Sequence, residues 1–182
     1  MLMNNERISI TQEGEFEIII KSYFDINKQN ILVLWIILWT IAGIGILSQF
    51  FFPQPEGFTT YLIVWLAFWA YFEYKVVLAY RWRKFGLERI VIKDDMVFIT
   101  REIANRGIPE KYEVNWIKNL KIKEVKKENF IAAISKAYWN PGEEKIVFDY
   151  KGKEIHFGME LSDKEVKNIV KRLGRKIDSL RS

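Results

Sequence analysis

The chain has 182 residues and contains no cysteine and a single histidine. Without cysteine it has no disulfide framework, no thiol nucleophile and no thiolate metal site. The one histidine, His156, has no cluster of metal-ligating residues beside it in the sequence, so we expect it to be an ordinary strand residue. The sequence therefore predicts neither a metal site nor a cofactor.

The sequence also lacks the motifs of the common enzyme classes. The stretch NRGIPEK has one glycine and one proline, whereas a phosphate-binding loop needs several glycines. Two pairs of adjacent carboxylates, at residues 94–95 and 143–144, fall at the ends of expected strands, where turn formation accounts for them. We expect a protein without enzymatic activity.

Charge is almost absent from one long segment. In residues 31–80 the only charged side chains are Glu56, Glu73 and Lys75. Residues 81–182 hold 24 Lys and Arg against 16 Asp and Glu, and residues 1–30 hold 3 against 5. A nearly neutral apolar block therefore separates a short acidic arm from a basic C-terminal region.

The apolar block is long enough for two membrane helices. Residues 31–52 are an uncharged run of 22 residues, which as a helix covers about 33 Å, enough for the roughly 30 Å hydrocarbon core of a bilayer. Residues 59–72 are too few to cross, so the second helix must continue past Glu73. We predict an antiparallel transmembrane hairpin over residues 31–82, with helices at about 31–52 and 59–82.

Positive charge lies at one end of this hairpin. Arg81, Arg83 and Lys84 follow the second helix, whereas the linker between the helices carries Glu56 and no basic residue. The positive-inside rule then places both termini in the cytoplasm, which in a bacterium means the inner face of the inner membrane. We expect the three basic residues to contact anionic lipid headgroups, each contributing about 1 kcal/mol.

Glu73 and Lys75 are ionisable residues within the predicted second helix. Lys75 is close enough to the helix end to extend its ammonium group towards the headgroups. The carboxylate has two interpretations: it relays protons or binds a cation, or it forms a structural hydrogen bond between the helices. Because two helices cannot enclose a conducting path, we favour the structural bond, with the indole N–H of Trp35 or Trp39 as donor.

From Leu87 onwards the hydrophobic pattern changes to the period of two that is typical of strands. The predicted strands are residues 87–93, 96–102, 111–116, 117–125, 144–150 and 153–159, with two-residue turns at 94–95 and 151–152. The run NFIAAIS is either a strand or a short helix. Ser162 and Glu165 then form a capping box ahead of an amphipathic helix. Residues 83–182 therefore predict an antiparallel barrel like that of pleckstrin-homology (PH) domains, capped by a C-terminal helix.

Residues 1–30 have strand character on both sides of Gly14 and emerge on the same side as the predicted barrel. We predict a β arm that adds a strand to the barrel or packs on it. The alternative is a mobile acidic tail, which would leave the apolar run Ile18, Ile19 and Ile20 exposed to water.

A second group of basic residues follows the third predicted strand. Its members are Lys118, Lys121, Lys123, Lys126 and Lys127. They form either a basic patch for lipid or partner, or a solvated strand face. A specific phosphoinositide site is disfavoured, because Asp94 and Asp95 in the first hairpin repel a phosphorylated headgroup. Nucleic acid is not expected as a partner, since the basic stretch lacks interleaved aromatic residues for stacking.

Four segments carry a resemblance to known proteins: RISITQEGEFEIIIK, WAYFEYKVVL, YEVNWIKNLKI and IVFDYKGKEIHFGMELSDKEV. Together they resemble a family of uncharacterised bacterial membrane proteins that join a two-helix anchor to a cytoplasmic PH-like domain. The layout is also similar to that of the photosystem I assembly factor family. The resemblance implies a membrane α+β fold and an interaction or scaffold protein.

We therefore expect a non-enzymatic scaffold that binds or helps assemble a protein partner at the cytoplasmic face of the membrane. The expected partners are the lipid bilayer and a protein or larger membrane complex, with a homo-oligomer as an alternative. The second hypothesis is an accessory subunit of a transporter or proton-handling complex that uses Glu73. The third is a sensor of anionic lipid.

Overall fold

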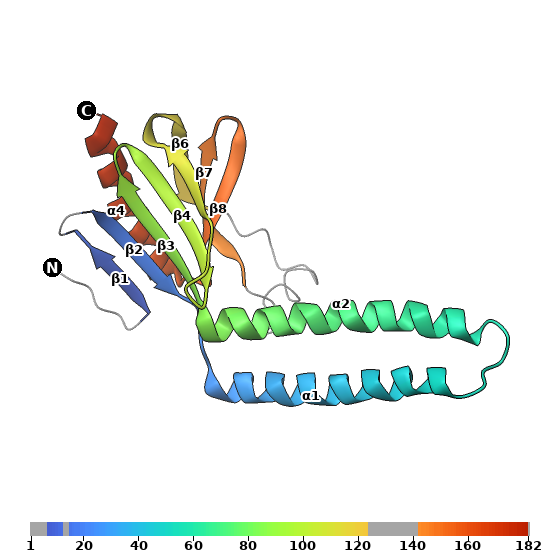
Figure 1. Ribbon diagram of the computed structural model, residues 1–182. Coiled ribbons are helices and arrows are strands. Elements are labelled where there is room, and N and C mark those ends of the chain that lie inside the picture. Colours follow the sequence, from blue (N-terminus) through green and yellow to red (C-terminus); the bar gives the residue numbers. More distant parts are fainter. Residues whose placement is uncertain (1–6, 13–14, 124–141, 182) are drawn as a thin grey trace.

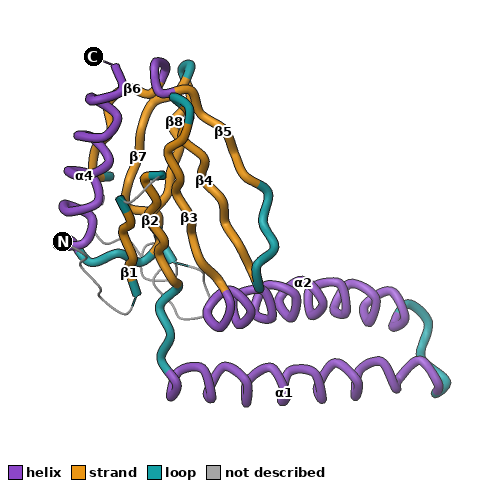
Figure 2. Tube along the Cα trace, turned by 60° about the vertical axis from the view of Figure 1, so that its left-hand side comes forward, coloured by secondary structure: helices purple, strands orange, loops and turns teal. Residues whose placement is uncertain are grey.

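Two long helices project from one edge of a body made of antiparallel strands and one further helix (Figures 1 and 2). The structure is a computed structural model, and it describes residues 7–12, 15–123 and 142–181. The order of elements is the predicted one: N-terminal strands, two apolar helices, antiparallel sheets and a C-terminal helix. The two sheets and the last helix enclose one core.

The first sheet has five antiparallel strands, of which the N-terminal arm supplies two. In spatial order they are β1 (Ile8–Thr11), β2 (Phe16–Lys21), β3 (Gly86–Lys93), β4 (Met96–Ile103) and β5 (Pro109–Glu113). Strand β2 pairs with β3 along its whole length, from Phe16 opposite Ile92 to Lys21 opposite Leu87. Ile18 is fully buried, because alternate residues of β2 face the core. The prediction that the arm adds a strand is confirmed.

The turn between β3 and β4 follows the sequence prediction. Asp94 and Asp95 both have positive φ, 49° and 58°, as a two-residue hairpin turn requires of its central residues. Aspartate tolerates this left-handed conformation better than most residues. The acidic pair therefore shapes the turn.

The second sheet has three antiparallel strands, β6 (Ile117–Ile122), β7 (Glu144–Tyr150) and β8 (Lys153–Met159). The predicted strand 111–116 ends at Glu113, because Val114–Trp116 forms a 3-10 turn, η2, that carries the chain into the second sheet. The predicted strand 117–125 ends at Ile122. The ambiguous run NFIAAIS lies outside the described residues.

Helix α4 (Asp163–Arg181) packs its apolar face on the sheets. The capping box forms as predicted: the Glu165 carboxylate accepts from the Ser162 backbone N–H at 2.6 Å, and Ser162 Oγ accepts from the Glu165 N–H at 3.4 Å. The buried stripe is Val166, Ile169, Leu173 and Ile177. At the other end, the Arg181 guanidinium donates to the carbonyl of Val114 at 2.9 Å. Both ends of α4 are thereby fixed.

The two projecting helices are α1 (Ile26–Ser48) and α2 (Phe58–Phe85), joined through a short 3-10 turn, η1 (Gln49–Phe51). Helix α1 starts five residues before the predicted position 31, because the Asp25 carboxylate caps it by accepting from the N–H groups of Asn27 and Lys28. Helix α2 runs three residues past the predicted end at 82 and passes directly into β3.

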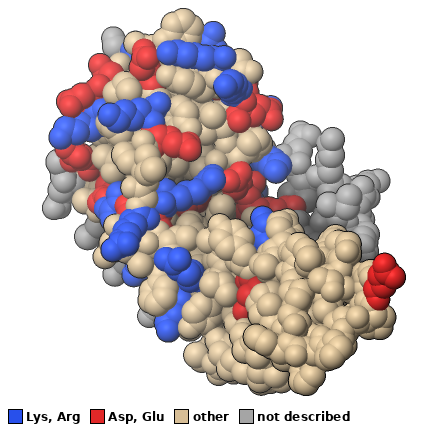
Figure 3. Space-filling model, turned by 45° about the vertical axis from the view of Figure 1, so that its right-hand side comes forward, with Lys and Arg blue, Asp and Glu red and all other residues tan. Residues whose placement is uncertain are grey.

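Both helices are long and apolar enough to cross a membrane. Only 11% and 17% of the residues in their most apolar segments are buried within the protein, so neither is a core helix. Figure 3 shows the contrast: the helical pair is almost free of charge, whereas basic and acidic side chains are mixed over the body. Water would be an unfavourable solvent for this apolar surface.

Candidate functional site

The helices and the body are connected by two chain segments that lie side by side. Strand β2 leads into α1, and α2 leads into β3 without a linker. Ser22, just after β2, donates its hydroxyl to the carbonyl of Arg83 at 2.9 Å, and its N–H to the carbonyl of Gly86 at 3.0 Å. The entry and exit of the helical pair are therefore held together by hydrogen bonds.

Arg83 is buried at this junction, with 2% of its side chain exposed. Its Nη1 forms an ion pair with Glu160 Oε1 at 2.5 Å and donates to the carbonyl of Tyr23 at 3.4 Å. Arg7 binds the same corner, donating to the carbonyls of Glu160 at 2.8 Å and Met159 at 3.2 Å. The expectation that Arg83 contacts lipid is wrong, because α2 extends into the body. Its neighbours Arg81 and Lys84 are exposed, as a lipid contact requires.

Glu88 ties the two sheets together. Its side chain is 1% exposed, and one carboxylate oxygen accepts from the backbone N–H groups of Gly158 at 2.8 Å and Met159 at 3.0 Å. Arg101 donates to the other oxygen at 3.2 Å and to the carbonyl of His156 at 2.9 Å. Burial raises the pKa of the Glu88 carboxyl, although the bonds to Met159 and Arg101 oppose this effect.

Our sequence reasoning missed this buried carboxylate. The signal was present: Glu88 lies two residues before Ile90 and four before Ile92, on the face of β3 that the alternation assigns to the core. A charged residue at such a position needs hydrogen-bond donors, which here come from β8 and β4.

Inside the helical pair, Glu73 accepts a hydrogen bond from the hydroxyl of Thr40 at 2.7 Å. The expected donors were the indoles of Trp35 and Trp39, and this expectation is wrong. The Trp39 N–H points to the carbonyl of Trp69 at 3.5 Å, while the Trp69 N–H donates to the carbonyl of Trp39 at 2.9 Å. Trp35 stacks on Trp39 with ring centroids 5.1 Å apart.

Glu73 therefore accepts a hydrogen bond from the neighbouring helix, with a different partner from the one expected. Its second oxygen, Oε2, is buried and has no hydrogen-bond partner among the described residues. Lys75 is exposed, and its ammonium group lies 5.7 Å from the centre of the Tyr71 ring.

The predicted basic cluster lies only partly within the described residues. Lys118 and Lys121 are exposed on β6, and Lys123 is exposed just after it. Lys126 and Lys127 lie outside the described residues. His156 lies in β8, with its Nε2 3.7 Å from a carboxylate oxygen of Glu154. Within residues 7–12, 15–123 and 142–181, no three His, Cys, Asp or Glu residues are grouped as metal ligands.

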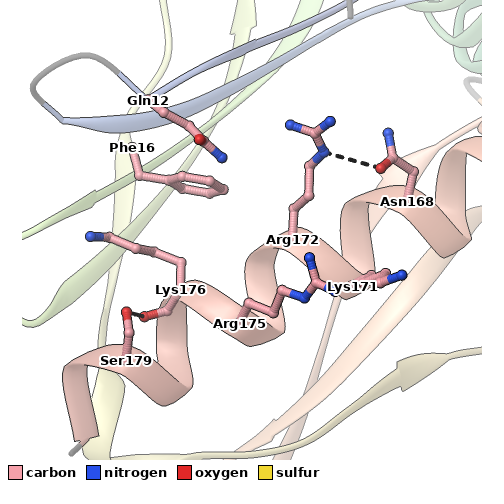
Figure 4. Close-up of a pocket in the computed structure, with 8 residues that line it drawn as sticks. All are labelled: Gln12, Phe16, Asn168, Lys171, Arg172, Arg175, Lys176 and Ser179. Atoms are coloured by element: carbon pink, nitrogen blue, oxygen red, sulfur yellow. Dashed lines mark hydrogen bonds between the residues drawn. The ribbon is translucent and has the colours of Figure 1, made fainter. Parts of the chain in front are cut away.

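A basic groove lies between the β1–β2 hairpin and α4 (Figure 4). It has a volume of about 710 Å³. The hairpin contributes Gln12 and Phe16, and α4 contributes four basic side chains. These are Lys171, Arg172, Arg175 and Lys176. In Figure 4 the side chains of Gln12 and Phe16 extend towards the helix, and those of Arg172 and Lys176 extend towards the hairpin.

The described residues that line the groove include four basic side chains and no acidic one. Arg172 donates from Nε to the side-chain oxygen of Asn168 at 3.1 Å. In the described part of the chain, no carboxylate forms an ion pair with any of the four basic residues. Sequence reasoning identified the last helix as amphipathic but did not identify the groove, because the groove exists only once the N-terminal hairpin has joined the sheet.

No protein-family model, curated protein or solved structure matches the chain.

Proposed function

We propose that this chain is a membrane-anchored, non-enzymatic interaction protein, in which the α1–α2 pair is the anchor and the body holds a protein partner. The observation that carries the proposal is the contrast between the two parts. The helices expose apolar side chains along lengths that suit a bilayer, about 35 Å and 42 Å, whereas the body is compact, charged and grooved.

The arrangement of strands supports a PH-like body. Two antiparallel sheets pack together, and a C-terminal amphipathic helix lies on the core they enclose. The arm adds two strands to this plan. We infer that the body and both termini lie in the cytoplasm, with the linker around Glu56 on the other side of the inner membrane. The basic residues Arg81 and Lys84 at the end of α2 support this orientation.

The experiment has a membrane part and a partner part. Membranes that contain the full chain are washed with alkaline carbonate, and an integral protein stays in the pellet. A photo-crosslinking amino acid is then placed at exposed positions of the body, in turn Lys118, Lys153 and Lys171. We expect a discrete heavier adduct from at least one position. Release by carbonate, or the absence of an adduct at all three positions, would contradict the proposal.

Glu73 favours a second candidate, an accessory subunit of a proton-handling complex. The observation is its oxygen Oε2, buried in the helical pair without a partner among the described residues. The test is Glu73→Gln, which keeps the acceptor for Thr40 but cannot exchange a proton. Loss of transport with intact membrane assembly would support this candidate, and unchanged transport would exclude it.

A further inference from the structure

We propose that the groove between the β1–β2 hairpin and α4 binds an extended acidic segment of the protein partner. This inference rests on the proposed function and names the chemistry of the partner. The site consists of Lys171, Arg172, Arg175 and Lys176 on one side and Gln12 and Phe16 on the other.

The first argument is the arrangement of charge on α4. Lys171 and Arg175 are four residues apart, and so are Arg172 and Lys176, so each pair is neighbouring on the helix surface. Like charges at this spacing repel each other and destabilise a helix. Among the described residues, no carboxylate forms an ion pair with any of these four side chains, so no direct contact there relieves the repulsion. An anionic ligand in the groove would remove it.

The second argument is spacing. Residues four apart on a helix are separated by about 6 Å along the axis. Alternate residues of an extended chain lie on one side and are about 6.6 Å apart. A segment with carboxylates at every second position can therefore run along α4 and place one carboxylate near Lys171 and Arg172 and the next near Arg175 and Lys176. A cavity of about 710 Å³ is far larger than a single small anion requires.

The third argument is the position of the groove. Both views of the fold place α4 on the opposite side of the body from the projecting helices (Figures 1 and 2). If those helices span the membrane, the groove faces away from the lipid headgroups. Phe16 is 5% exposed, so its ring cannot stack on a nucleobase. These facts favour an acidic protein segment over a lipid or a nucleic acid.

The test uses the full chain in nanodiscs of phosphatidylcholine, a lipid without net charge. A short fluorescein-labelled peptide of alternating glutamate and serine is titrated at low ionic strength and followed by fluorescence anisotropy. We expect binding that weakens as salt is added. The variant Arg175→Glu with Lys176→Glu should bind about tenfold more weakly.

The matched control is Lys164→Glu with Lys167→Glu, which makes the same change in charge on the same helix outside the groove. It should leave the affinity nearly unchanged. Equal weakening by both variants would overturn the inference, and so would equal binding of a lysine–serine peptide. Equally effective competition by single-stranded DNA or inorganic phosphate would overturn it as well. If the peptide fails while crosslinking at Lys118 captures a partner, this inference fails and the proposed function stands.

Discussion

At the scale of single residues, the ion pair between Arg83 and Glu160 joins the end of α2 to the body. Arg83→Ala would leave the Glu160 carboxylate, 18% exposed, without its counter-charge. We expect the free energy of unfolding to fall by about 3 kcal/mol. This value is at the lower end of the range for a broken buried ion pair, because the Glu160 carboxylate is partly exposed to water. Thermal unfolding in mild detergent, followed by tryptophan fluorescence, measures the change. Arg81→Ala, at an exposed position, should have little effect, and an equal loss would contradict the assignment.

Glu88 predicts a dependence of stability on pH. Because burial raises its pKa above the usual value of 4.5, the folded chain binds this proton more tightly than the unfolded chain. The contribution of Glu88 to stability is therefore greatest in acid and is lost as the pH rises through the raised pKa. Glu88→Gln removes this component. The free energy of unfolding of both proteins is measured by chemical denaturation between about pH 4 and 8. The difference, variant minus wild type, should increase as the pH rises. Parallel curves would contradict the prediction.

Residue roles that depend on local sequence were predictable. The capping box of Ser162 and Glu165 and the turn at Asp94 and Asp95 need only neighbours a few positions away, and both form as expected. The role of Arg83 was not predictable in this way. A basic residue after an apolar helix is typical of a lipid contact, and only the fold brings Glu160 to it from 77 positions away.

At the scale of elements, Gly43 determines how closely α1 approaches α2. A Cβ atom at this position would lie 2.1 Å from Cε2 of the Trp69 side chain, whereas a Cβ at Gly45 would meet nothing within 4 Å. We expect Gly43→Ala to destabilise the helical pair by about 1–3 kcal/mol through overpacking. Gly45→Ala should be neutral or slightly stabilising, since alanine favours helix. Thermal unfolding followed by circular dichroism compares the two, and equal effects would contradict this packing.

The elements themselves were largely predictable, and their ends were not. Both long helices lie where the nearly uncharged apolar block places them, and most strands lie where the period of two places them. The start of α1 at Ile26 depends on the Asp25 cap, which precedes the apolar run and was therefore missed. The number of arm strands was also missed. The pairing of Ile8–Thr11 with β2 requires a free edge on β2. The sequence of residues 8–11 alone does not indicate that such an edge is present.

At the scale of the whole molecule, the fold predicts on which side of a membrane each part lies. Strands β2 and β3 are paired neighbours, and each continues into one of the two helices. The body must therefore lie at one end of the helical pair, and the linker at the other. The chain has no cysteine, so Gln54→Cys and Lys171→Cys each give a single reactive thiol. A membrane-impermeant maleimide should label them from opposite sides of sealed vesicles. Labelling from the same side would exclude a transmembrane hairpin.

The direct passage from α2 into β3 has a mechanical consequence. No residue separates the end of α2 from the start of β3, and the ion pair of Arg83 with Glu160 ties that end to the body, so a rotation of α2 would act directly on the sheet. If these helices span a bilayer, a tilt of the helical pair would also turn the groove beside α4.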